Sequence, residues 1–213
     1  MQRGIDTHLQ QCLMATSMLK STSIALVLLL GLSVYTGCAT KISATAEENP
    51  PPTEPLSAFT RFEVKPITMG APYTGQEANE KALVKIQENF DLRVNPLLAS
   101  WNTRKDDAMQ PRTLRIEPYL QDIKFVNATA RVWAGAMAGS SAVVLRIRLI
   151  DAERNVEIAH PEFFQRAAAM GGAWTFGSTD NNMLVRITEL ASNYLMNNYA
   201  SAVGGPTGKP RPE

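Results

Sequence analysis

Cysteine, histidine and net charge are all scarce in this sequence. The 213 residues include two cysteines (Cys12 and Cys38) and two histidines (His8 and His160), and the formal net charge is +1. Structural zinc usually takes four Cys or His ligands, and catalytic zinc takes about three protein ligands. We therefore predict no metal site and no cofactor. A near-neutral chain also lacks the basic surface that binds a polyanion, so nucleic acid is not an expected partner.

What is present is typical of a globular domain with appendages. Hydrophobic residues make up 45% of the chain and charged residues 19%, which is ordinary for a folded protein. The length allows one sizeable domain with its own core.

The longest apolar run lies near the N-terminus, from Ile24 to Tyr35. It has 12 residues, whereas a membrane-spanning helix needs about 20. Lys20 precedes the run, and the small residues Thr36 and Gly37 follow it. A basic start, a short apolar run and a small-residue junction predict a secretory signal peptide over residues 1–37. Met18 also has the features of a signal-peptide start, so it is a possible true start of translation.

The residues Tyr35-Thr36-Gly37-Cys38 resemble the bacterial lipobox, whose usual form is Leu-(Ala/Ser/Thr)-(Gly/Ala)-Cys. Thr36, Gly37 and Cys38 fit this form, and Tyr35 stands where Leu is usual. The resemblance implies that Cys38 is lipidated on sulfur and becomes the first residue of the mature protein. The alternative is an inert cysteine inside an apolar anchor helix. Ala39 follows the cysteine, and by resemblance to enterobacterial sorting this favours the outer over the inner membrane.

Proline-rich and glycine-rich segments flank the expected domain. Residues 40–57 are small and polar, with prolines at 50–52 and at 55, which favours an extended spacer of up to about 50 Å. We predict a lipidated cysteine and tether over residues 38–57, a folded domain over 58–200, and a disordered tail over 201–213.

Alternating and helical patterns fill the segment between the tether and the tail. Strands are expected at 59–67, at 114–125 with a possible bulge at Pro118, at 140–151, and at 156–168 after a turn at 151–155. A helix is expected from Thr74, kinked or split by Pro96, and a second one over 180–199 with Asp180 as a candidate N-cap. This order predicts an α+β fold: a mostly antiparallel sheet with helices packed on one face.

The least usual internal stretch runs from Arg131 to Ala142, with Gly135 and Gly139 among alanines. It is too short for a membrane-spanning dimer motif and lacks the Gly-Lys-Ser/Thr ending of a phosphate loop. A loop or a closely packed helical turn fits best. Trp174 lies in a second glycine-rich segment, where it could cover the sheet edge or stack on a ligand. Arg131, Gly135, Gly139 and Trp174 are thus the candidate interaction residues, and His160 is expected to be structural.

Arg131, the two glycines, the alternating strand at 143–151 and the final helix together resemble an uncharacterised domain of bacterial envelope lipoproteins. Asn155 stands where the turn of that domain usually has glycine, and Asn tolerates a positive φ. The resemblance brings no established activity and no catalytic residues. The domain is more distantly similar to the periplasmic part of curli-export pore lipoproteins, which oligomerise.

These observations predict a non-enzymatic lipoprotein anchored in the outer membrane, with a periplasmic domain that binds or assembles with an envelope partner or with itself. Two alternatives stay open: a subunit of an oligomeric export pore, and an envelope hydrolase whose catalytic residues the sequence does not reveal.

Overall fold

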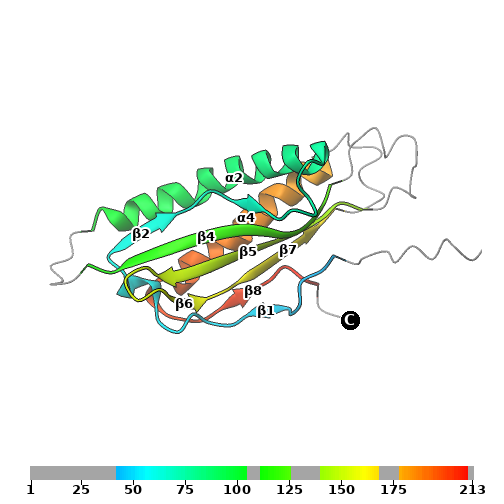
Figure 1. Cartoon of the computed structure of the whole chain (residues 1–213). Helices are drawn as coiled ribbons and strands as arrows, with labels where there is room; N and C mark the ends of the chain where they lie inside the picture. Colours follow the sequence, from blue (N-terminus) through cyan, green and yellow to red (C-terminus); the bar gives the residue numbers. More distant parts are fainter. Residues whose placement is uncertain (1–41, 105–110, 126–139, 168–177, 211–213) are drawn as a thin grey trace, which may run out of the picture. The chain divides into compact units, whose positions relative to one another are not determined.

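The computed structural model describes residues 42–104, 111–125, 140–167 and 178–210. Ile42–Glu213 form one compact unit. Its elements, in chain order, are β1 (Glu48–Asn49), the short 3-10 helix η2 (Leu56–Ala58), β2 (Arg61–Val64), β3 (Thr68–Met69), α2 (Glu77–Asn102), β4 (Thr113–Lys124), β5 (Ala142–Asp151), β6 (Val156–Ala159), β7 (Glu162–Arg166), α4 (Ser178–Ala200) and β8 (Gly205–Pro206) (Figure 1).

The main sheet is built on the long pair β4 and β5. The strand order is β2-β4-β5-β6, with β3 also pairing with β4 and β7 also pairing with β5. β2 and β3 run parallel to β4, whereas β4, β6 and β7 all pair with β5 in antiparallel orientation. The sheet is therefore mixed but mostly antiparallel, and the predicted α+β class is confirmed.

Both helices pack on the same face of this sheet (Figure 1). Because side chains alternate across a strand, every second residue of β5 faces the helices, and the residues between them face away. The helix-facing core contains, among others, Leu114, Ile116 and Leu120 from β4, Val143, Leu145, Ile147 and Leu149 from β5, Ile86, Phe90 and Val94 from α2, and Leu184, Ile187 and Leu195 from α4. The predicted apolar stripe of the last helix is thus the side that is buried.

Helix α2 continues through Pro96, so the predicted split is wrong. Proline lacks the N–H that would bond to the carbonyl of Leu92. Pro96 is exposed and Leu92 is 73% exposed, so that carbonyl lies on the solvent side of the helix, where water can bond to it.

Three local expectations are also corrected. The irregularity in β4 lies between Leu120 and Asp122, while Pro118 pairs normally with Ile147. α4 begins at Ser178, so Asp180 lies inside its first turn and is not the N-cap. The strand expected at 156–168 is two strands, because Pro161 follows β6 and lacks a ladder donor. The turn itself is confirmed, with Asn155 at φ 53°.

The segment predicted as a tether is instead part of the fold from Ile42 onward. Ile42 and Ala44 pack with Ala142, Val144 and Phe164 in a second cluster, which lies on the face of the sheet away from the helices. Polar contacts also hold the segment: the Asn49 side chain donates to the Glu162 carbonyl at 2.8 Å and accepts the Glu162 N–H at 2.7 Å. Backbone and amide bonds of this kind need no apolar periodicity, which is why the composition pointed to a free spacer.

The predicted disordered tail is also ordered as far as residue 210. β8 pairs with β1 in a separate two-stranded sheet (Figure 1), and the Thr207 carbonyl accepts the N–H of Phe164 in β7 at 2.7 Å. The chain reverses after α4 around Asn198, whose buried side chain accepts the N–H of Val203 and Gly204 and donates to the Gly204 carbonyl. Gly204 has φ +77°, and a Cβ there would lie 2.4 Å from the Asn49 carbonyl oxygen.

Candidate functional site

The predicted lipidation and interaction residues lie outside the described part of the chain. This holds for Cys38 and for the four candidate interaction residues, Arg131, Gly135, Gly139 and Trp174. Their places in the chain are still informative. Arg131 and the two glycines fall between β4 and β5, and Trp174 falls between β7 and α4.

On the face of the sheet away from the helices, polar side chains of β4, β5 and β6 come together around His160. Tyr119 Oη lies 2.8 Å from His160 Nε2, and His160 Nδ1 lies 3.4 Å from Glu157 Oε1. Burial lowers the pKa of His160, and the charges of Arg146 and Arg148 act in the same direction against Glu157. The imidazole is therefore neutral at pH 7, with Tyr119 on one ring nitrogen and a carboxylate on the other.

Arginines and glutamates surround this histidine in a continuous set of ion pairs. Arg148 lies 2.9 Å from Glu157 and 3.2 Å from Glu117, and Arg115 lies 2.7 Å from Glu117. A hollow of about 240 Å³ adjoins them, lined by Lys65, Pro66, Thr68, Glu117, Pro118, Tyr119 and Arg148. Since both Arg148 and Arg115 already have acidic partners, this face is a balanced network and not a bare anion site.

Glu162 is buried on the same face of the sheet and is fully engaged. Its Oε2 receives Arg146 at 2.6 Å, and its two oxygens accept the N–H and the hydroxyl of Thr45 at 2.7 and 3.1 Å. The side chain is 7% exposed. Glu162 thus fastens the first residues of the domain to β5 and β7.

A second buried carboxylate, Asp151, is the last residue of β5. Its side chain is 1% exposed and receives Arg112 at 2.6 Å, while Arg112 also binds Glu54 with both terminal nitrogens at 2.7 and 2.9 Å. Burial acts to raise the pKa of Asp151, but hydrogen bonds from Arg112 and from the Arg154 N–H outweigh it, and the pKa lies below its ordinary value. Glu54, expected in a free tether, is therefore a partner in this ion-pair triad.

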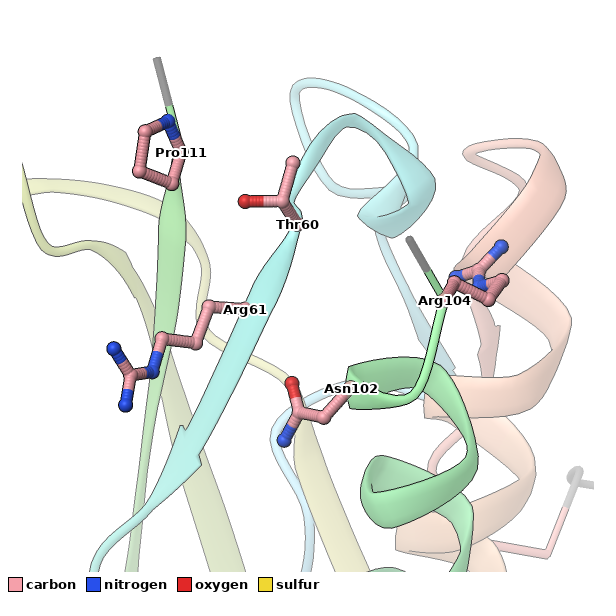
Figure 2. Close-up of a pocket in the computed structure, with 5 residues that line it drawn as sticks. All are labelled: Thr60, Arg61, Asn102, Arg104 and Pro111. Atoms are coloured by element: carbon pink, nitrogen blue, oxygen red, sulfur yellow. The ribbon is translucent and has the colours of Figure 1, made fainter. Parts of the chain in front are cut away.

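A hollow of about 440 Å³ is lined by Thr60, Arg61, Asn102, Arg104 and Pro111 (Figure 2). Asn102 is already used, because its amide accepts the N–H of Phe62 at 2.8 Å and donates to the Phe62 carbonyl at 3.0 Å. Arg104 lies 4.3 Å above the Tyr199 ring. Figure 2 shows Arg61 and Arg104 extending away from each other, so the two cations do not converge on one ligand.

Within the described residues, no group of three or more His, Cys, Asp or Glu side chains is placed to hold a metal ion. None of the described helices is long and apolar enough to cross a membrane.

No protein-family model matches the sequence, and no curated protein is detectably similar to it. Solved structures are similar at a distance. The PelC dodecamer from Paraburkholderia phytofirmans matches with a TM-score of 0.36 and 11% identity over 68% of this chain and 96% of that one. A putative lipoprotein from Caulobacter crescentus CB15 matches with a TM-score of 0.33 and 15% identity over 68% and 92%. The hypothetical protein CT253 from Chlamydia trachomatis gives 0.34 and 9% over 66% and 99%.

The structural similarity to PelC and to the putative lipoprotein is distant and low in sequence identity.

Proposed function

We propose that this protein is an envelope lipoprotein, anchored in the outer membrane through Cys38, whose periplasmic domain is a non-enzymatic binding or assembly module. The observation that carries the proposal is the position of the lipobox-like residues Thr36-Gly37-Cys38 relative to the fold. The compact unit begins at Ile42, only four residues after Cys38.

This short connection changes the geometry that the sequence predicted. Four residues span at most about 14 Å, since an extended chain advances about 3.5 Å per residue. Ile42 is packed on the sheet and Thr45 is bonded to Glu162. A lipidated Cys38 would therefore hold the domain directly at the membrane surface instead of on a spacer of about 50 Å.

The described acidic groups support a binding role better than hydrolysis. Asp151 and Glu162 are buried, and each is neutralised by an arginine at 2.6 Å. The pKa of Asp151 lies below its ordinary value because of its hydrogen bonds to Arg112 and to the Arg154 N–H, whereas a general acid needs a raised pKa near the working pH. These two groups therefore stabilise the fold and leave the charged outer face for recognition.

Metabolic labelling of cells with a clickable palmitate tests the anchor. We expect label on the wild type and on Cys12→Ala, and none on Cys38→Ala. Cys12 is the matched control because it is the other cysteine of the chain. A wild type without label, or equal label on Cys38→Ala, would refute the proposal. Ala39→Asp tests the membrane: by the sorting behaviour above, it should move the protein from outer-membrane to inner-membrane fractions.

Sedimentation equilibrium of the lipid-free domain tests the assembly role against the pore alternative. A single monomeric species over a wide range of concentrations would count against a self-assembling pore subunit and leave partner binding. A discrete closed oligomer would favour assembly with itself.

A further inference from the structure

We propose that Asn102 keeps the outer edge of β2 closed to strand pairing with a second copy of this chain. β2 is an end strand of the main sheet, because it pairs with β4 on one side and with no other described strand. An edge strand offers backbone N–H and C=O groups to any other chain that can align with it. This edge is separate from the Cys38 anchor of the proposed function.

The ladder with β4 shows which residues of β2 face the open edge. Lys65, directly after β2, donates its N–H to the Ile116 carbonyl in β4 at 2.9 Å. Successive residues of a strand direct their backbone groups to opposite sides, so the N–H and C=O of Val64 and of Phe62 point away from β4. Pro66, the next residue in this alternation, has no N–H. Phe62 and Val64 are therefore the two residues of β2 that could both donate and accept at the edge.

Asn102, the last residue of α2, holds the first of these two positions. Its Oδ1 accepts the N–H of Phe62 at 2.8 Å, and its Nδ2 donates to the Phe62 carbonyl at 3.0 Å. Figure 2 shows the side chain extending from the helix toward β2. A side-chain amide carries the same kinds of donor and acceptor as a peptide group. Asn102 thus makes the two hydrogen bonds that a neighbouring strand would make.

The same contact occurs at another edge of the sheet, where it lies inside the fold. Asn49 of β1 makes both bonds to the backbone of Glu162 in β7, at 2.7 and 2.8 Å. Further chain covers that edge, since the Thr207 carbonyl accepts the N–H of Phe164 in the same strand. Asn49 is 7% exposed, whereas Asn102 is an exposed residue. Asn102 therefore closes its edge at the surface of the domain.

A second copy fits this edge because its own β2 presents the matching groups. When two copies of β2 align antiparallel around Glu63, Phe62 of each copy lies opposite Val64 of the other. Residues in such pairs exchange both their N–H and C=O groups, so every hydrogen bond of these pairs uses Phe62. On the exposed side, the diagonal neighbours of Glu63 are Arg61 and Lys65 of the other copy, which are of opposite charge. Asn102 blocks the whole of this pairing by occupying Phe62.

Sedimentation equilibrium of residues 42–213 tests this role, because they form one compact unit that holds both core clusters. Asn102→Ala frees the backbone of Phe62, and we expect the association constant to rise at least about tenfold over wild type. Asn95→Ala is the matched control. Asn95 is exposed on the same helix and its amide bonds to the Asp91 side chain, so this variant should associate as wild type does.

A second substitution separates edge pairing from association caused by unfolding. Val64→Pro removes an edge N–H and costs no hydrogen bond to β4, so N102A/V64P should return to the wild-type association constant. Hydrogen exchange gives an independent measurement, because protection of the Phe62 N–H in N102A should rise with protein concentration. Asn102→Ser is too short to reach both groups of Phe62. It covers the case in which N102A unfolds, and its association constant should rise as well.

Association of N102A and N102S no stronger than that of wild type, or association of N102A that V64P leaves unchanged, would overturn the proposal. A monomeric N102A whose Phe62 N–H is protected only by an added extended peptide would also count against the second copy, since another chain would then be the occupant. Residues 42–213 lack Cys38, so this result and the palmitate labelling can fail independently.

Discussion

Removal of Arg112 should destabilise the domain strongly, because it leaves Asp151 charged and without its main partner in the interior. The Asp151 side chain is 1% exposed, and those of Arg112 and Glu54 are 22% and 28% exposed. Breaking a buried ion pair by deleting one partner costs about 3–5 kcal/mol. Arg112→Met keeps an apolar stem over the Phe59 ring, which lies 4.4 Å below the guanidinium, so most of that loss should be electrostatic.

The matched variant is Glu54→Gln, which removes the more exposed carboxylate and leaves Arg112 with Asp151. This pair is closer to a surface ion pair, and we expect a loss of about 1 kcal/mol or less. Urea unfolding followed by circular dichroism measures both values. In the double variant R112M/D151N no charge stays buried, so it should regain part of the loss.

The same ion-pair triad predicts that the free energy of unfolding depends on pH, and it predicts the sign of that dependence. The folded pKa of Asp151 lies below its ordinary value, so its contribution is present above about pH 4 and is lost as the pH falls through the folded pKa. In R112M the unpaired, buried carboxyl has a raised pKa instead. The stability gap between wild type and R112M should therefore narrow as the pH falls from 7 toward 4. A difference in unfolding free energy between wild type and R112M below about 1 kcal/mol at pH 7, or a difference independent of pH, would refute this reasoning.

Three further predictions concern the chain reversal after α4 and the polar outer face. Asn198→Ala leaves the N–H of Val203 and Gly204 without their acceptor, and should cost about 3 kcal/mol in urea unfolding with faster hydrogen exchange over residues 203–207. Gly204→Ala should cost at least about 1 kcal/mol more than Gly75→Ala, because both have φ +77° but only Gly204 meets a backbone oxygen; equal losses would contradict the contact. His160 has a lowered pKa, so wild-type stability should fall as the pH drops below about 6.5. His160→Gln should lose that part of the pH dependence of stability. An unchanged pH dependence in this variant would show that other groups cause it.

The parts of the fold with strong periodicity could be predicted from the sequence. The alternation at 143–149 indicates β5, and the stripe of Leu184, Ile187 and Leu195 indicates α4, because burial on one side imposes a period on the chain. Both elements are found close to the expected bounds. Arg146 and Arg148 alternate with these apolar residues, and they also predict the polar side of β5.

The two ends of the domain escaped prediction for a physical reason. Residues 42–57 are held by hydrogen bonds, an ion pair and apolar contacts to distant groups, such as Asn49 to Glu162, 113 residues away. No local pattern records a partner at that distance. The same applies to Tyr119, His160 and Glu157, which meet through the pairing of β4, β5 and β6. The clearest local sign that this polar segment packs on the domain is its isolated apolar residues. Ile42, Leu56 and Phe59 are all buried.

The pairing of β1 with β8 also sets a limit on when this domain can become complete. The first strand finds its partner at Gly205 and Pro206, near the far end of the described chain. During synthesis, β1 must therefore wait until nearly the whole domain has been made before its strand pairing can close, whereas the contacts of Thr45 and Asn49 with Glu162 need only the chain as far as β7. Until then β1 has no strand partner, and the last described residues of the chain are what complete the N-terminal edge of the fold.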